Sequence, residues 1–480
     1  MLFNSYEFLI FFPAIVALYF MTPFKWRWLL LLVGSCYFYM CWKPEYIVLM
    51  MFPSLIDYYV AVKLSATTDM ARRKKYLWFS LASNLGLLFV FKYFNFFNES
   101  FRGLFHFLNV PYAVPVVNLL LPVGISFYTF QTLSYTIDVY KGTIKPELHF
   151  GKFALYVTFF PQLVAGPIER SSNLLPQLQS LRYKFDADRV TDGLRLMLWG
   201  FFKKVVIADR LAASVNLVYN NPGEYYGLQV VLATIFFAFQ IFCDFSGYSD
   251  IAIGAAKIFG VNLMKNFDKP YSAQSISEFW KRWHISLSTW FKDYVYIPLG
   301  GNRAIKWRWY YNLFITFFIS GLWHGANWTF VIWGALHGFY LIFAIISRPY
   351  KDALIGLIGL NKRPLALKML QVLSTFVLVN LGWLFFRANS LADAMLLLKN
   401  MFVFAPLASV FDFITPGALA INLMLIAILE LAHYLEKDKP FVLSLTGKSA
   451  LIRWPAYVAV TLAILYLSTS AGQQFIYFQF

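Results

Sequence analysis

Two histidines stand out because their sequence surroundings can support chemistry. His324 lies in GLWHGANW (321–328), between a tryptophan and a glycine inside a long apolar stretch. His284 lies forty positions earlier, in SEFWKRWHISLSTWFKDYVYIPLGGNR (277–303). A neutral imidazole near pH 7 can accept the proton of a hydroxyl, and burial without an acidic neighbour keeps the ring neutral. One or both of these histidines would therefore suit general-base chemistry on a hydroxyl group.

Other common kinds of active site have no candidate in this sequence. There is no GxSxG elbow for a serine hydrolase and no HExxH motif, and the histidines lack metal-ligand spacing, so no metal site is predicted. TGKS (446–449) is similar to the end of a phosphate-binding loop, but Val442 stands where the first glycine of that motif belongs. Cys36, Cys41 and Cys243 show no CxxC spacing, which leaves neither a disulfide framework nor a zinc site.

Each histidine also has a purely structural interpretation. His324 could be a neutral side chain hydrogen-bonded between two helices, although its position favours function. The stretch around His284 interleaves tryptophans with cations, a pattern typical of a helix that anchors at the headgroup boundary, where the histidine would be incidental. Without other information that incidental role is slightly favoured for His284. His337 falls in a GxxxG spacing (334–338), which favours close helix packing over chemistry.

The elements that must position these histidines are membrane helices. The chain has 480 residues, of which 59% are hydrophobic and only 14% are charged, whereas soluble proteins carry roughly a quarter charged residues. Apolar runs recur along the sequence, many long enough to cross a hydrocarbon core of ~30 Å. We expect an all-α, polytopic integral membrane protein with about ten to twelve spans or half-spans, folded as a single domain over residues 1–480. The net charge of +17 then reflects cytoplasmic loops, and no nucleic-acid partner is expected.

The basic loops predict how the chain is oriented. Expected helices are 5–22, 28–42, 44–62, 77–92, 369–386, 416–434 and 454–470. Basic turns at 25–27 and 72–75, and basic loops at 265–310, 348–368 and 435–453, should be cytoplasmic. The N-terminus is then extracytoplasmic, and the first apolar stretch is a retained helix rather than a signal peptide. The amphipathic stretch 390–400 is expected at a membrane interface.

The position of His324 follows from this topology. Residues 311–347 are apolar and lie between two cytoplasmic loops, so they must enter the membrane and return. A first arm over 311–323 spans roughly 20 Å, too short to cross the core, so His324 is expected inside the membrane at a break. Gly321 and Gly325 should loosen the helix there, and Asn327 could cap the helix of the return arm, 328–346. An ionisable residue at such a depth favours a functional site.

Several stretches together give a family resemblance. FWKRWHISLSTWFKDYVYIPLGGNR and GLWHGANWTFVIWGALHG resemble the membrane-bound O-acyltransferase superfamily. The similarity continues through LLPVGISFYTFQTLSYTIDVYKG (120–142), FPQLVAGPIER (160–170), CDFSGYSDIAIG (243–254) and the closing FIYFQF. It covers nearly the whole chain and is strongest for bacterial subunits that O-acetylate alginate, with related systems for cellulose and peptidoglycan.

The resemblance implies a fold, a reaction and a set of residues. The fold is a ring of tilted helices, some short or re-entrant, around a tunnel that joins a cytoplasmic entrance to an outer funnel. His324 takes the place of the family's essential histidine, and His284 that of its second polar position. The expected enzyme is a bacterial inner-membrane O-acetyltransferase with no bound cofactor. It would use acetyl-CoA as donor and pass the acetyl group, through an extracytoplasmic partner, to a polysaccharide.

The remaining site candidates are weaker. Lys281, Arg282 and Arg303 are expected to attract the anionic donor, and Asn327 and Trp323 to contact the donor or substrate. D-alanyl transfer to teichoic acid by a more distant branch of the family is an alternative. A transporter or flippase that uses the histidines as proton relays is another, although no internal repeat supports it. A structural scaffold for polymer export leaves GLWHGANW unexplained.

Overall fold

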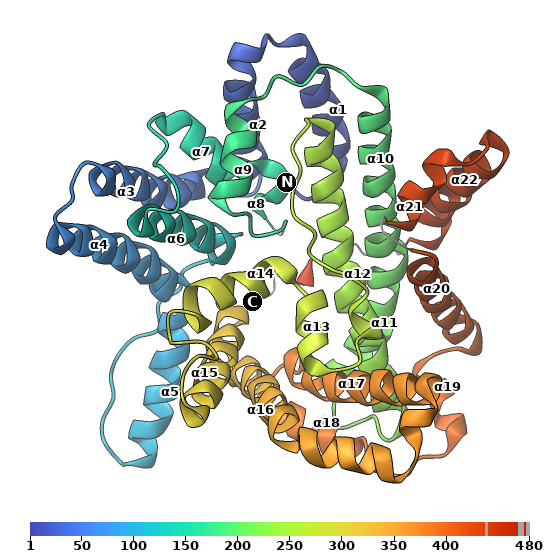
Figure 1. The fold of residues 1–480 in the computed structure, drawn as a ribbon. Coiled ribbons are helices and arrows are strands. Elements are labelled where there is room, and N and C mark those ends of the chain that lie inside the picture. Colours follow the sequence, from blue (N-terminus) through green and yellow to red (C-terminus); the bar gives the residue numbers. More distant parts are fainter. Residues whose placement is uncertain (165, 437–439, 469–474, 477–480) are drawn as a thin grey trace. The chain divides into compact units, whose positions relative to one another are not determined.

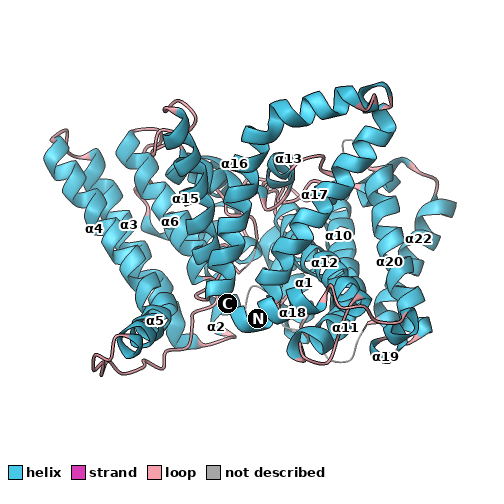
Figure 2. Ribbon diagram, turned by 90° about the horizontal axis from the view of Figure 1, so that it is seen from below, coloured by secondary structure: helices cyan, strands magenta, loops and turns pink. Residues whose placement is uncertain are grey.

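The fold is known from a computed structural model, which describes residues 1–164, 166–436, 440–468 and 475–476. Every regular element in these ranges is a helix, as predicted (Figures 1 and 2). Parts of four sequence predictions lie outside the described residues. They are residue 165 of the 160–170 motif, 437–439 of the last basic loop, 469–470 of the last helix and 477–480 of the closing motif.

The chain packs as two compact units, Met1–Met197 with Tyr248–Met264, and Leu198–Gly247 with Lys265–Phe480. The expectation of a single domain stays a prediction. The first unit holds α1 (Tyr6–Met21), α2 (Arg27–Met40), α3 (Ile47–Ser65), α4 (Met70–Leu88), α5 (Phe94–Phe107), α6 (Ile125–Lys141), α7 (Phe150–Thr158), α8 (Phe160–Leu163) and α9 (Ser171–Gln179). Residues of α10 (Ala187–Phe201) and α12 (Leu228–Ile258) belong to both units. The second holds α11 (Asp209–Asn220), α13 (Ile276–Arg282), α14 (Ile285–Phe291), α15 (Lys306–His324), α16 (Trp328–Leu357), α17 (Pro364–Arg387), α18 (Leu391–Asn400), α19 (Val410–Phe413), α20 (Pro416–Leu435), α21 (Phe441–Ser444) and α22 (Ala450–Leu467).

Seven helical stretches in the described part of the chain are long and apolar enough to cross a membrane. They are Pro44–Ser65, Met70–Phe107, Leu228–Ile258, Trp328–Leu357, Pro364–Arg387, Pro416–Leu435 and Ala450–Leu467. The chain is therefore a multi-pass membrane protein. The ten to twelve expected segments included half-spans, and α1, an apolar helix of 16 residues, is shorter than the ~20 residues a full span needs.

A buried carboxylate ties three helices of the first unit together. The carboxylate of Asp57 on α3 accepts a hydrogen bond from the Ser80 hydroxyl on α4. Asn84 Nδ2, also on α4, donates to the two oxygens of this carboxylate at 3.1 and 2.8 Å. Thr132 on α6 completes the cluster by donating to Asn84 Oδ1 at 3.0 Å. All four side chains are buried. In an apolar bundle such groups are tolerated only when they are hydrogen-bonded, so the cluster fixes how α3, α4 and α6 pack.

The basic run at 72–75 is helical rather than a turn, which corrects the sequence prediction. Helix α4 begins at Met70, seven residues before the predicted start at 77, because Asp69 caps it by accepting from Ala71 N at 2.9 Å. The Arg73 guanidinium donates to the Tyr140 carbonyl at 2.6 Å, which ties this end of α4 to the end of α6. The helix then continues through a π-helical segment, Phe89–Tyr93, into α5.

A buried ion cluster organises the second unit. Lys204, in the π-helical segment Phe202–Ala208, lies 2.7 Å from Asp209 and 2.6 Å from Asp244 on α12. Asp244 also accepts from the backbone N–H of Ile476 at 2.8 Å, so the cluster holds this part of the C-terminal segment. Paired charges of this kind keep their geometry because removing one partner leaves an uncompensated buried charge.

Candidate active site

The GLWHGANW stretch is a break between two helices, as predicted. Helix α15 ends at His324 and α16 begins at Trp328. Asn327 caps α16, since its Oδ1 accepts from Thr329 N at 3.0 Å. Helix α15 starts at Lys306, five residues before the predicted arm, and the added residues are basic and aromatic. The apolar residues of the predicted arm, 311–323, all lie in α15. The membrane depth of His324 stays a prediction.

The glycines of this region allow close packing and do not loosen α15, which continues through Gly321. A Cβ on Gly321 would lie 2.3 Å from the Phe330 carbonyl oxygen, and one on Gly334 would lie 2.3 Å from the Phe317 carbonyl oxygen. Helices α15 and α16 therefore approach backbone to backbone at these two glycines. The packing role predicted for the GxxxG stretch is confirmed, and the loosening predicted for Gly321 is wrong.

His284 lies at a sharp turn between two short helices and not within one anchoring helix. Helix α13 ends at Arg282 and α14 begins at Ile285, and His284 between them adopts a left-handed backbone conformation with φ 44° and ψ 55°. For a non-glycine residue this conformation costs about 1 kcal/mol or more, so the surrounding contacts must hold it. We call residues 283–285 the kink.

The two predicted histidines come together in the second unit. The ring centroids of His284 and His324 are 6.5 Å apart, with planes at 53°. His284 is fully buried and His324 is 3% exposed. Burial lowers the pKa of the His284 imidazole well below its usual value, so this ring is neutral at physiological pH.

Aromatic rings surround the histidine pair. Phe245 on α12 meets His284 edge to face at 4.6 Å between centroids. His324 contacts Trp323 at 5.0 Å, Trp333 at 4.8 Å and Phe386 at 5.3 Å. These rings come from α12, α15, α16 and α17, so four helices define where the imidazoles lie.

The aromatic residues near His284 are not an exposed belt. The tryptophans predicted for the headgroup boundary are buried, at 8% exposure or less: Trp280, Trp283 and Trp290. Trp280 donates its indole N–H to Nδ1 of His337 at 3.2 Å, which joins α13 to α16. Trp280 and Trp283 pack against rings of other helices of the unit, so they do not form an exposed belt. The position of this stretch relative to the headgroup boundary stays a prediction.

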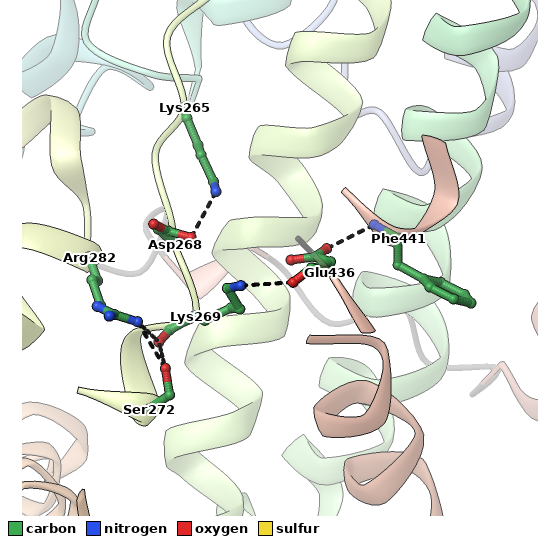
Figure 3. A network of polar contacts seen from close by, with 7 residues as sticks. All are labelled: Lys265, Asp268, Lys269, Ser272, Arg282, Glu436 and Phe441. Atoms are coloured by element: carbon green, nitrogen blue, oxygen red, sulfur yellow. Dashed lines mark hydrogen bonds and ion pairs between the residues drawn. The ribbon is translucent and has the colours of Figure 1, made fainter. Parts of the chain in front are cut away.

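The structure separates the three predicted donor-binding cations. Lys281 and Arg303 are exposed. Arg282 instead bonds Glu278 at 2.6 Å and the Ser272 hydroxyl at 2.9 Å. Figure 3 shows Arg282 in the network that connects residues 265–272 to α13. We call residues 265–272 the strap. Arg282 thus has an internal structural partner, whereas Lys281 and Arg303 present their charges to the surface.

The other two predicted contacts also have structural roles. Asn327 holds the break from both sides, capping α16 and donating from Nδ2 to the Asn389 carbonyl at 3.2 Å. Trp323 is buried, and its ring centroid lies 6.3 Å from that of His284 and 5.0 Å from that of His324. Of these two, only Trp323 contacts the histidine pair.

Some neighbours of the histidines were not predicted as site residues. Phe245 belongs to the CDFSGYSDIAIG stretch, which carried part of the resemblance but no assigned role. Trp333 belongs to the GLWHGANWTFVIWGALHG stretch, which carried part of the resemblance but gave Trp333 no role. Phe386 lies in an apolar helix, and Asn266 in the strap had no pattern of its own. In the described residues, no group of three or more His, Cys, Asp or Glu side chains is arranged to hold a metal ion.

Comparison with known proteins identifies the family. The model of the membrane-bound O-acyltransferase family matches residues 144–386, which include both histidines. The probable alginate O-acetylase AlgI of Pseudomonas aeruginosa is 39% identical to this chain, over 84% of this chain and 75% of that protein. The chain belongs to the membrane-bound O-acyltransferase family. The resemblance inferred from the motifs is thus confirmed, and the protein is an acyltransferase.

Two further relatives differ in the reactions that their names give. The peptidoglycan O-acetyltransferase of Helicobacter pylori is 37% identical over 77% of this chain and 73% of that protein. The teichoic acid D-alanyltransferase of Bacillus subtilis is 30% identical, over only 49% of this chain and 63% of that protein. Similarity to the relatives named for O-acetylation is thus higher and extends further along the chain.

Proposed function

We propose that this chain is a membrane-embedded O-acetyltransferase that passes an acetyl group from a cytoplasmic donor to a hydroxyl acceptor, for O-acetylation of an extracellular or cell-wall polysaccharide. The observation that carries the proposal is the meeting of His284 and His324 among buried aromatic rings. The similarity to alginate and peptidoglycan O-acetylating relatives supports acetyl as the group and a polysaccharide as the final acceptor.

His324 is the general base in this proposal. Its imidazole takes the proton of the acceptor hydroxyl while the hydroxyl oxygen attacks the carbonyl carbon of the acetyl thioester. The carbonyl then re-forms, the carbon–sulfur bond breaks, and the departing thiolate takes the proton back from His324. The products are an acetate ester and a free thiol, and the histidine ends in its starting state.

His284 supports the same reacting centre. Hydrogen bonds to a reacting group span roughly 2.6–3.2 Å, so two imidazoles whose centroids are 6.5 Å apart can both reach one thioester between them. Because burial keeps His284 neutral, one ring nitrogen carries a proton that it can donate to the carbonyl oxygen as negative charge develops there. We assign His284 this role.

The donor in the proposal is acetyl-CoA. Its phosphates are anionic, and the basic 265–310 region provides exposed cations at Lys281 and Arg303. The internal bonds of Arg282 make it a support for α13 rather than a phosphate ligand. The positive-inside pattern of the loops supports the proposal that this region faces the cytoplasm at a bacterial inner membrane, with the N-terminus outside.

The acceptor chemistry ends outside the membrane. All residues that the proposal uses lie in a helical membrane unit, so an extracytoplasmic acetyltransferase partner is proposed to complete transfer to the polymer. D-alanyl transfer is the less supported alternative, because the D-alanyltransferase of B. subtilis matches only 49% of the chain.

The test is donor turnover by the purified full chain. Wild-type protein should release free CoA thiol from acetyl-CoA, and release should increase when a hydroxyl acceptor is added. His324→Ala should lose this release, and D-alanyl thioester should not replace acetyl-CoA. Release by wild type at the rate of His324→Ala would refute the proposed donor reaction.

A further inference from the structure

The kink that carries His284 is fastened by a residue of the strap. The Asn266 carbonyl oxygen accepts the Ile285 N–H at 2.9 Å. The Asn266 side-chain Oδ1 accepts the Ser286 hydroxyl at 2.9 Å and the Ser286 N–H at 3.3 Å. These bonds fall on the two residues that directly follow His284.

The bonds replace a cap that His284 does not provide. The first N–H groups of a helix have no partner within the helix and usually bond the side chain of the N-cap residue, where Ser, Thr, Asp or Asn is preferred. His284 occupies the N-cap position of α14, and its side chain makes no capping bond. Asn266 supplies the acceptors for the first two N–H groups from a neighbouring segment. The imidazole therefore points to Phe245 and His324 while the helix start remains bonded.

Burial and neighbouring backbone hydrogen bonds hold Asn266 in position. Asn266 is 1% exposed and Ser286 is fully buried. Two residues further along the strap, the Asp268 N–H bonds the Arg282 carbonyl at 2.9 Å, on the other side of the kink. Lys269 shares with His284 a left-handed backbone, with φ 47°. Strained backbone at two such positions persists only when several contacts define it.

We infer that Asn266 is a positioning residue for acyl transfer, acting through the backbone of His284. This inference rests on the proposed function, because it concerns the geometry of His284 relative to His324. Small displacements of a reacting group, of about 1 Å, can lower a rate by about a hundredfold. Loss of Asn266 should therefore reduce kcat much more than it changes KM for the donor.

The experiment compares purified full-length variants by CoA thiol release and by thermal unfolding. Asn266→Ala should lower kcat at least about tenfold with KM for acetyl-CoA changed less than about twofold. Asn266→Asp keeps acceptor oxygens at the same position and should recover most of kcat. Ser286→Ala removes one of the bonds, should lower kcat less, and serves if Asn266→Ala does not fold.

Asn400→Ala is the matched control. Asn400 is also a buried asparagine of the second unit, 3% exposed, and its Nδ2 bonds the Pro222 and Tyr225 carbonyls at 2.8 and 3.3 Å. Its loss should lower the melting temperature about as much as loss of Asn266, with kcat within about twofold of wild type. Equal loss of kcat in both alanine variants, or no recovery in Asn266→Asp, would reduce Asn266 to an ordinary core residue.

His284→Ala separates failure of this inference from failure of the proposed function. If His284→Ala loses activity but Asn266→Ala and Ser286→Ala keep wild-type kcat, the positioning role is wrong and the site stands. If His284→Ala itself keeps wild-type activity, His284 has no part in the reaction, and the role assigned to it in the proposed function is wrong.

Discussion

The imidazole of His284 lies 6.5 Å from that of His324, centroid to centroid, although forty positions separate them in the chain. The two arrive by different means. His324 ends helix α15 at a break capped by Asn327, and His284 occupies a left-handed kink bonded by Asn266. Both are buried among aromatic rings of four helices. The site therefore depends on two helix ends and on the packing that holds them.

The close approach of α15 and α16 predicts a strong effect of one methyl group. Gly321→Ala should lower the free energy of unfolding by about 1–3 kcal/mol and reduce activity, because its Cβ would lie 2.3 Å from the Phe330 carbonyl oxygen. Gly356→Ala, on α16, is the control, since nothing lies within 4 Å of its added Cβ. Thermal unfolding in detergent measures both. Equal melting temperatures for the two variants would show that the helices do not meet at Gly321.

Asn327 should act as a helix cap and not as a donor ligand. Asn327→Ala should cost about 1 kcal/mol of stability, because Thr329 N loses its acceptor, while KM for acetyl-CoA stays unchanged. Asn327→Asp should restore most of the melting temperature, since aspartate caps equally well but cannot donate to the Asn389 carbonyl. A raised KM at an unchanged melting temperature would instead assign Asn327 to donor binding.

The burial of His284 predicts a pH dependence of stability. Its folded-state pKa is well below the unfolded value of about 6.5. Above about pH 6.5 the His284 imidazole is neutral in both the folded and the unfolded protein. Below about pH 6.5 the imidazole of the unfolded protein binds a proton that the folded protein does not bind. The free energy of unfolding therefore falls by up to about 1.4 kcal/mol per pH unit. His284→Gln should flatten this fall in thermal unfolding, whereas His106→Gln, at an exposed position of α5, should keep it. An unchanged slope in His284→Gln would argue against a buried neutral imidazole.

Donor attraction should separate Lys281 from Arg282. Lys281→Ala should raise KM for acetyl-CoA a few-fold at low salt, with a smaller effect at high salt, because an exposed charge is screened. Lys399→Ala, an exposed lysine on α18, is the control and should leave KM unchanged. Arg282→Ala should lower the melting temperature through loss of the Glu278 and Ser272 bonds. If Lys281→Ala and Lys399→Ala have the same KM, Lys281 does not attract the donor.

Sequence patterns predicted the helical membrane fold and the break at His324, because apolar length and a capping asparagine are local signals. They also placed His284 among the site candidates, through resemblance rather than through any local pattern. What they missed depends on contacts between distant segments. Trp280 and Trp283 pack against rings of other helices. Gly321 is required by the close approach of α16, and Asn266 caps a helix that starts nineteen positions further along the chain. A belt of aromatic residues and a buried aromatic cluster have the same composition, so only the packing distinguishes them.

The central claim is that His324 is the base for acyl transfer. The most direct measurement is acetyl transfer to an acceptor by membranes that contain His324→Ala, with His106→Ala and wild type at equal protein levels. Transfer by His324→Ala should fall at least about a hundredfold, the typical minimum contribution of a general base, while the variant stays folded and inserted in the membrane. Transfer by a folded His324→Ala at a rate close to wild type would contradict the proposed mechanism.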